Sequence, residues 1–200
     1  MQQELADQTR YQEMEILLSH DFDNMDLVQL EEIASEYINL QKQGDTLHWN
    51  SEQYKAWQYL YLKIEQQKNK DDLIKVGDVF HSCWGYDQTN TEFYKIVSIS
   101  KTGKSAKVVQ VAAEAIGDAK ENARNMSDSA IPDPENIIDS REQLVKVERR
   151  HQKNAWTNKS EQVGEIQLRG SVFIGTDENS CKHLTTLYRV KGACSRSWYA

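Results

Sequence analysis

The sequence predicts an α+β protein, with an N-terminal helical hairpin or small bundle followed by a small antiparallel β-barrel or half-open roll. Apolar residues recur at helical spacing as far as residue 72, and short apolar runs bounded by turn residues follow it. The charge changes at the same place: residues 1–72 hold 15 acidic and 6 basic residues, whereas residues 73–200 hold 16 and 18. We therefore predict an acidic helical region, 1–72, and a β-rich domain, 73–200.

Two segments before residue 72 carry helix signals. In the first, an apolar stripe starts at Leu27 after a cap at Asp23 or Asn24, and Gly44 ends it. The second follows Asn50 and Ser51, either of which suits a helix cap. Its aromatic residues recur in a row that we expect to be core, although a row of this kind also suits a binding surface. The row is Tyr54, Trp57, Tyr61 and Ile64. A weaker segment, about 4–18, is a third candidate helix.

The β-rich domain begins with a short strand near residue 79 and a hairpin. Residues 93–99 and 108–111 form the arms of the hairpin, and Lys101–Lys104 form its turn. Residues 113–142 are polar and contain both prolines, so we predict a long excursion with a short helix there. Further short strands are expected in four segments: 143–150, 164–175 with a break at Gly170, 185–190 and 195–200. Five to seven short strands are typical of a small barrel or roll.

The stretch SCWGYDQTNTEFYKIVSI, residues 82–99, combines aromatic side chains with small polar ones. Its amides and hydroxyls favour a tight corner in which Trp84 and Phe93 cap the core. A recognition loop is the alternative, and catalysis is a third reading. The candidate binding residues of this stretch are Trp84, Tyr86, Asp87, Gln88, Asn90 and Tyr94.

The same stretch resembles the signature GDxFxxSWGYDQTNxxFYxV of a family of small proteins encoded largely by bacteriophages, prophages and plasmids. Members of that family end in a strand similar to LWDGKPxxxSWYA, and this chain ends in LYRVKGACSRSWYA. Leu187 and residues 197–200 match that ending, whereas Val190–Cys194 depart from it, and Trp198 and Tyr199 join the candidate binding residues. The resemblance covers about residues 75–200. It implies a mobile-element origin and a compact β fold, and it brings no reaction with it.

The chain has three cysteines, and its N-terminus is neither basic nor apolar. These features predict free thiols in the cytoplasm of a bacterial host cell. The pairs His81 with Cys83 and Cys181 with His183 lack the CxxC spacing of zinc sites, so we expect no metal and no cofactor. Two residues apart on a strand, His81 and Cys83 should lie too far apart for a direct hydrogen bond, so no catalytic residue is predicted. Whether these four residues gather with Cys194 is left open.

Residues 145–159 form the most basic segment, in which cations surround Trp156. Such a mixture suits single-stranded nucleic acid, so Arg149, Arg150 and Trp156 are further candidate binding residues. The net negative charge of the whole chain is unfavourable for binding nucleic acid.

Three functions remain in order of preference. The first is a non-enzymatic mobile-element accessory protein that binds a host protein; an inhibitor of a bacterial defence system is one example. The alternative is a nucleic-acid-binding accessory factor that uses the β domain, and an enzyme of unrecognised type is third. No run of about 18 apolar residues is present, so no membrane partner is expected.

Overall fold

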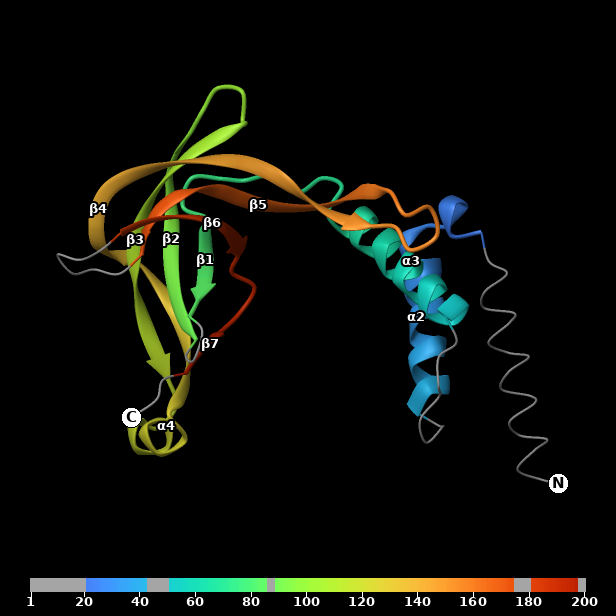
Figure 1. Cartoon of the computed structure of the whole chain (residues 1–200), viewed down its shortest axis with the longest axis horizontal. Helices are drawn as coiled ribbons and strands as arrows, with labels where there is room; N and C mark the ends of the chain where they lie inside the picture. Colours follow the sequence, from blue (N-terminus) through green and yellow to red (C-terminus); the bar gives the residue numbers. More distant parts are fainter. Residues whose placement is uncertain (1–20, 43–50, 86–88, 175–180, 198–200) are drawn as a thin grey trace. The chain divides into compact units, whose positions relative to one another are not determined.

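The computed structural model describes residues 21–42, 51–85, 89–174 and 181–197 (Figure 1). The α+β class is confirmed, since helices come first and an antiparallel sheet follows. The chain forms two compact units: unit 1 contains residues 1–72 and 149–165, and unit 2 contains residues 73–148 and 166–200. The candidate helix at 4–18 lies outside the described residues.

Unit 1 is built on two helices, α2 (Leu27–Lys42) and α3 (Ser51–Lys68), after a single 3₁₀ turn, η1 (Phe22–Asn24). Asp26 begins α2, because its carboxylate accepts from the backbone N–H of Gln29 at 3.0 Å and its own N–H donates to the Gln29 side chain. The predicted cap at Asp23 or Asn24 is therefore wrong, since these two residues belong to η1. No helix in the described part of the chain is long and apolar enough to cross a membrane.

The two helices pack through one apolar cluster, and the aromatic row of α3 is mostly outside it. The cluster contains Phe22, Leu30, Ile33, Ala34, Leu60 and Ile64. Tyr54 and Tyr61 are 52% and 46% exposed, and the rings of Trp57 and Tyr61 lie 5.1 Å apart. The prediction that this row is core was wrong at Tyr54 and Tyr61, whereas Ile64 belongs to the cluster and Trp57 is partly buried against it. The face of α3 that packs against α2 instead carries Leu60, which lies one helical turn before Ile64.

Residues 149–165 connect two long strands, yet they complete unit 1. The Arg149 guanidinium donates to the backbone carbonyls of Asn69, Asp72 and Gly164. The Gln66 side chain donates to the carbonyl of Gln162 at 2.9 Å. The bonds from Arg149 to Asn69 and Asp72 and from Gln66 to Gln162 span 77 to 96 positions, which is why the simple division at residue 72 leaves out a part of the helical unit.

Unit 2 contains a sheet whose strands pair in the order β3-β2-β1-β6-β5-β4-β7. Because β3 also pairs with β4, the pairings among the six strands β3, β2, β1, β6, β5 and β4 form a circuit that begins and ends at β3. The strands are β1 (Val79–Trp84), β2 (Asn90–Ile99), β3 (Ser105–Ile116), β4 (Ser127–Lys153), β5 (Ser160–Ile174), β6 (Cys181–Arg189) and β7 (Cys194–Ser197). The predicted hairpin is β2 and β3.

The predicted polar excursion at 113–142 is instead mostly strand. β3 continues to Ile116, the short helix α4 (Ala119–Asn125) follows, and β4 begins at Ser127. β4 pairs with β3 from Ile116 back to Ser105, and it passes the proline region through register shifts between Gln110 and Ala112. Backbone bonds to a distant partner hold this polar segment, and the irregular register accommodates Pro134, whereas Pro132 lies opposite Ala113 in regular register.

Gly170 was predicted to break a strand, but β5 runs through it. A Cβ at residue 170 would lie 2.9 Å from the Leu144 carbonyl oxygen and 3.0 Å from Val145 Cγ1. Glycine is therefore needed for the close approach of β4 to β5, rather than for a turn.

The sheet of unit 2 has two apolar clusters. The larger contains Phe80, Tyr94, Ile96, Ala106, Val108, Val145, Ile166, Leu168, Val172 and Leu187. The smaller contains Phe93, Val111 and Ala130, with Val79, Val190 and Cys194 packed against it. Phe93 and Tyr94 are neighbours in β2 and belong to different clusters, so both faces of β2 are covered.

Candidate binding sites

The aromatic candidates of β1 and β2 have different environments. Trp84 is the last residue of β1 and is 41% exposed, so the prediction that it caps the core was wrong. Phe93, the other predicted cap, is fully buried. Asn90 lies opposite Trp84 in the β1–β2 pair. Five other candidates lie outside the described residues: Tyr86, Asp87, Gln88, Trp198 and Tyr199.

Tyr94 is a structural residue rather than an exposed recognition residue. Its ring is fully buried, and its hydroxyl lies 2.8 Å from both Glu92 Oε2 and the carbonyl oxygen of Phe173. Burial raises the pKa of the Tyr94 hydroxyl, and the neighbouring Glu92 carboxylate adds to the effect. Tyr94 therefore stays neutral and joins β2 to β5.

His81 and Cys83 are in contact, contrary to prediction. The Cys83 Sγ lies 3.5 Å from His81 Nδ1 and 3.4 Å from Thr91 Oγ1, and burial lowers the pKa of His81. Burial also raises the pKa of the Cys194 thiol, with a smaller contribution from Cys83. Among the described residues no group of three His, Cys, Asp or Glu side chains could hold a metal ion. The contact forms a thiol–imidazole pair, and the His81 ring also lies 6.2 Å from the Tyr188 ring.

The two motifs that carry the family resemblance meet at Thr89 and Ser197, which are 108 positions apart. The Thr89 N–H donates to the Ser197 carbonyl at 3.1 Å, and the Ser197 N–H donates to the Thr89 carbonyl at 2.9 Å. The Thr91 hydroxyl donates to the Ser195 carbonyl at 2.9 Å. β7 is thereby held between β4 on one side and the start of β2 on the other.

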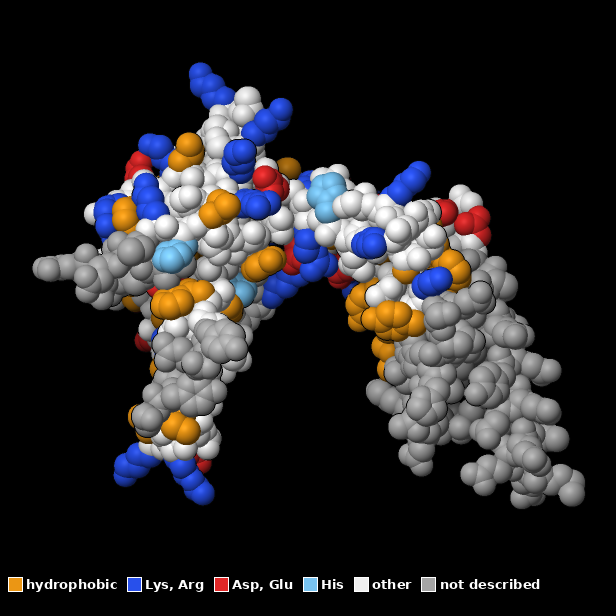
Figure 2. Space-filling view, viewed as in Figure 1, with side chains coloured by type: hydrophobic (Ala, Val, Ile, Leu, Met, Phe, Trp, Pro, Cys, Tyr) orange, Lys and Arg blue, Asp and Glu red, His pale blue; other side chains and the backbone are white. Residues whose placement is uncertain are grey.

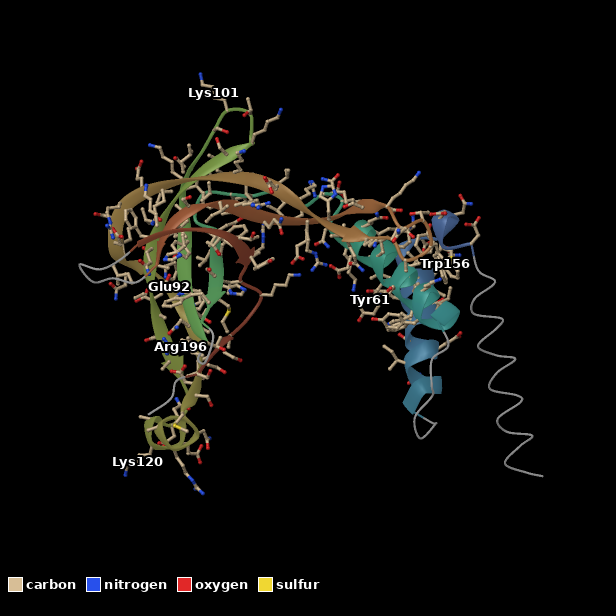
Figure 3. The ribbon with its side chains drawn as sticks, in the orientation of Figure 1. Tyr61, Glu92, Lys101, Lys120, Trp156 and Arg196 are labelled. Atoms are coloured by element: carbon tan, nitrogen blue, oxygen red, sulfur yellow. The ribbon has the colours of Figure 1, made fainter. Side chains whose placement is uncertain are left out.

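A pocket of about 460 Å³ opens at this junction. Arg196, which is labelled in Figure 3, lies in its wall and forms a two-point ion pair with Asp128. The lining residues are Thr89, Ile116, Asn122, Asn125, Ser127, Asp128, Ser129, Ser195, Arg196 and Ser197. Sequence reasoning missed this pocket, because its residues come from five separate segments and most of them are serine or asparagine. The resemblance motifs gave the nearest signal, since they include Thr89 and Ser197.

The predicted basic patch is largely used inside unit 1. Arg149 is held by three backbone carbonyls, as described above. Arg150 Nε lies 3.3 Å from Glu165 Oε2, and its Nη2 lies 3.9 Å from Glu65 Oε2. Trp156, labelled in Figure 3, is 49% exposed in the turn between β4 and β5. The structure therefore separates this patch into two bound arginines and one exposed aromatic residue.

The turn that carries Trp156 is held by hydrogen bonds to the Asn154 side chain. Asn154 is buried, and its Oδ1 accepts from the backbone N–H groups of Trp156 and Thr157 at 2.8 and 3.1 Å. Asn158 has a positive φ of 58°, a conformation that asparagine tolerates. The turn therefore holds Trp156 in a defined position, with the exposed Lys153 and Lys159 at either side in the sequence.

Comparison of the chain with protein-family models, with curated proteins and with solved structures finds no match.

Proposed function

We propose that this chain is a non-enzymatic accessory protein of a phage or plasmid that binds a host protein through unit 1, with inhibition of a bacterial defence system as one form of that activity. In this proposal unit 2 is a small closed β-barrel, as the circuit of six paired strands suggests. The mobile-element setting comes from the family resemblance at residues 75–200.

The distribution of charge is the observation that carries the proposal. Residues 1–72 have a net charge of −9, and residues 149–165 hold 4 basic and 2 acidic residues. Unit 1 therefore carries −7, which is the whole formal charge of the chain, and unit 2 is neutral. A field of one sign concentrated on one unit attracts a basic partner surface and speeds its association.

Four cations of unit 1, namely Lys63, Lys68, Arg149 and Arg150, are engaged within the unit, whereas several carboxylates face solvent. Lys63 pairs with Asp23, Lys68 with Glu31 at 2.7 Å, and the two arginines are held as described. Glu32 and Glu36 are exposed and lie one turn apart on α2. Figure 2 shows hydrophobic side chains over α3, where Tyr54 and Tyr61 are about half exposed. Exposed tyrosines on the same unit also suit a protein partner, since aromatic residues supply much of the binding energy at interfaces.

A binding comparison between three forms of the chain tests the proposal. The test variant is Glu32→Gln with Glu36→Gln, and the control is Glu114→Gln with Glu121→Gln, which removes the same charge from exposed positions of unit 2. The forms are used as bait in bacterial lysate, and the retained host protein is purified and titrated by calorimetry. We expect the test variant to bind at least about tenfold more weakly and the control to match the wild type. Equal binding of all three forms contradicts the proposal.

A nucleic-acid-binding factor is the second candidate, and the exposed Trp156 between Lys153 and Lys159 favours it. Fluorescence anisotropy with single-stranded and duplex oligonucleotides at about 150 mM salt distinguishes the two. We expect no submicromolar binding, because the carboxylates of unit 1 oppose phosphate. Submicromolar binding that weakens in Trp156→Ala and Lys153→Glu would replace the protein-binding proposal with the second candidate.

A further inference from the structure

The pocket at the junction of Thr89 and Ser197 is built from residues of unit 2, whereas the charged surface of the proposed function belongs to unit 1. The end of β3, the helix α4, the start of β4, the strand β7 and the residue before β2 each supply part of its wall. Its volume of about 460 Å³ falls within the range of pockets that hold small organic ligands.

The register of β4 and β7 sets the walls of the pocket. Ser127 lies opposite Ser197, and Ser129 lies opposite Ser195, so four hydroxyl-bearing residues occupy the two cross-strand pairs on either side of the pair Asp128–Arg196. Thr89 contributes a fifth hydroxyl, and α4 contributes the carboxamides of Asn122 and Asn125. The Asn122 Nδ2 donates to the Ile116 carbonyl at 3.0 Å, which leaves the Oδ1 of that carboxamide to accept. The lining thus offers donors and acceptors in similar numbers.

Among the described residues of the lining, the only two charged side chains neutralise each other. Arg196 Nε lies 2.8 Å from Asp128 Oδ1, and Arg196 Nη2 lies 2.5 Å from Asp128 Oδ2. The side chain of Asp128 is only 6% exposed, so this pair is sheltered from solvent. An anionic ligand would have to compete with Asp128 for the guanidinium, and a cationic ligand would have to compete with Arg196 for the carboxylate.

The lining also excludes a mainly apolar ligand. Ile116, which is 42% exposed, is the one aliphatic side chain among the described residues that line the pocket. Burying hydroxyls and carboxamides against hydrocarbon would leave them without hydrogen bonds, which costs free energy for each group. A ligand that fits must therefore be uncharged, must present both donors and acceptors around its surface, and needs one small apolar face.

We propose that this pocket binds a neutral polyhydroxylated ligand of the saccharide class. A sugar hydroxyl donates one hydrogen bond and accepts others, as the serine and threonine hydroxyls do, so the two sets are complementary. The C–H groups on one face of a sugar ring supply the apolar patch that meets Ile116.

Saturation-transfer NMR on the full chain tests this site. The probes are glucose, galactose, mannose, N-acetylglucosamine and maltose, together with glucosamine and glucuronate as the cationic and anionic counterparts of glucose. We expect at least one neutral sugar to bind with a Kd of about 1 mM or tighter, and the charged counterparts to bind more weakly than glucose. Absence of transfer to every neutral sugar overturns the proposal, and so does preferred binding of glucuronate or glucosamine.

Two variants locate the binding. Ser129→Val with Ser195→Val removes two facing hydroxyls and keeps residues that favour strands, and Asn125→Ala changes α4, which has no buried residue. We expect each to weaken sugar binding at least about fivefold, which corresponds to roughly 1 kcal/mol per altered hydrogen-bonding site. Thr102→Val, in the exposed turn between β2 and β3, is the matched control and should bind as the wild type does.

Sugar binding that is unchanged in Asn125→Ala would show that the ligand lies elsewhere and would overturn the assignment. This variant keeps the test decisive even where the double serine variant fails to fold. Because the host-protein surface belongs to unit 1, loss of sugar binding in these variants leaves the test with Glu32 and Glu36 unaffected.

Discussion

Trp84 and Phe93 lie on paired strands, yet only one of them belongs to the core. Phe93 is fully buried between β2, β3 and β4, whereas Trp84 is 41% exposed at the end of β1. We expect Phe93→Ala to lower the free energy of unfolding by about 3–5 kcal/mol, as for other buried aromatic residues. Trp84→Ala should lower it by less than Phe93→Ala does, since Trp84 buries a smaller fraction of its side chain. Urea unfolding followed by circular dichroism measures both values, and a larger loss for Trp84→Ala would contradict the assignment.

His81 makes the stability of unit 2 depend on pH. Burial lowers the pKa of His81 below its ordinary value of 6.5, so the unfolded chain takes up a proton at a higher pH than the folded chain does. The contribution of neutral His81 is therefore fully present above about pH 6.5 and is lost as the pH falls through the folded pKa.

His81→Gln should accordingly show a smaller fall in melting temperature between about pH 7.5 and pH 5.5 than the wild type does. Thermal melts at half-unit pH steps give the comparison. His151→Gln, at an exposed position, serves as the control and should keep the wild-type slope. Identical slopes for all three proteins would mean that burial of His81 has no effect on stability.

At the level of elements, the closest approach in unit 1 is between the start of β5 and the end of α3. Gly164 has a φ of +82°, and a Cβ there would lie 2.9 Å from Asn69 Cβ and 3.1 Å from the Asn69 carbonyl oxygen. Gly164→Ala should lower the free energy of unfolding by about 2 kcal/mol or more, because it combines left-handed strain with a backbone clash.

Two other glycines separate these causes. Gly103 has a φ of +68° with nothing within 4 Å, so Gly103→Ala carries strain alone. Gly192 has open space and no positive φ, and Gly192→Ala should change stability by less than about 0.5 kcal/mol. Chemical unfolding should rank the three losses as Gly164, then Gly103, then Gly192. If Gly192→Ala lowered the free energy of unfolding as much as Gly164→Ala does, left-handed strain and a backbone clash would not explain the loss at Gly164.

The elements that sequence reasoning predicted are those with local signals. α3 has a regular apolar spacing, and the β2–β3 hairpin has strand-forming arms around a glycine turn. β4 has no such signal between Ser127 and Gln143, because it is held by backbone bonds to β3 rather than by an apolar face. A periodic pattern of apolar side chains indicates which residues of a segment are buried. It indicates strand pairing only where the paired strands also bury one face of the sheet.

The candidate binding residues show the same difference between what a local signal predicts and what contacts with distant segments determine. Tyr94 was chosen for its aromatic ring, and the structure uses that ring in the core. Arg149 was chosen for its charge, and its guanidinium instead binds backbone carbonyls of unit 1. The pocket beside Ser197 could not be predicted, since short polar side chains become a site only when distant segments place them together.

For the whole molecule, the two compact units imply separate responses to mutation. Leu30 is fully buried in the cluster of unit 1, and Leu168 is fully buried in the larger cluster of unit 2. Each Leu→Ala variant should lose about 3–5 kcal/mol in its own unit, because no apolar cluster of the described residues contains residues of both units. Hydrogen exchange followed by mass spectrometry measures protection for each peptide.

We expect Leu30→Ala to speed exchange in α2, α3 and residues 149–165, and Leu168→Ala to speed it in the remaining strands. The peptide that contains Arg149–Glu165 is the informative one, because it joins two strands of unit 2 while it packs in unit 1. If that peptide responds to Leu168→Ala and not to Leu30→Ala, the division of the chain into these units is incorrect.

The segment 149–165, which packs in unit 1 although it connects strands of unit 2, also affects how the chain folds during its synthesis. The ribosome delivers the helices first, and domains generally fold as they emerge. Unit 1 nevertheless lacks the Arg149 guanidinium until β1, β2, β3 and most of β4 have been made, and it lacks the Gln162 carbonyl until β5 has begun. The N-terminal unit is therefore completed late, since Asn69 meets Arg149 80 positions later and Gln66 meets Gln162 96 positions later.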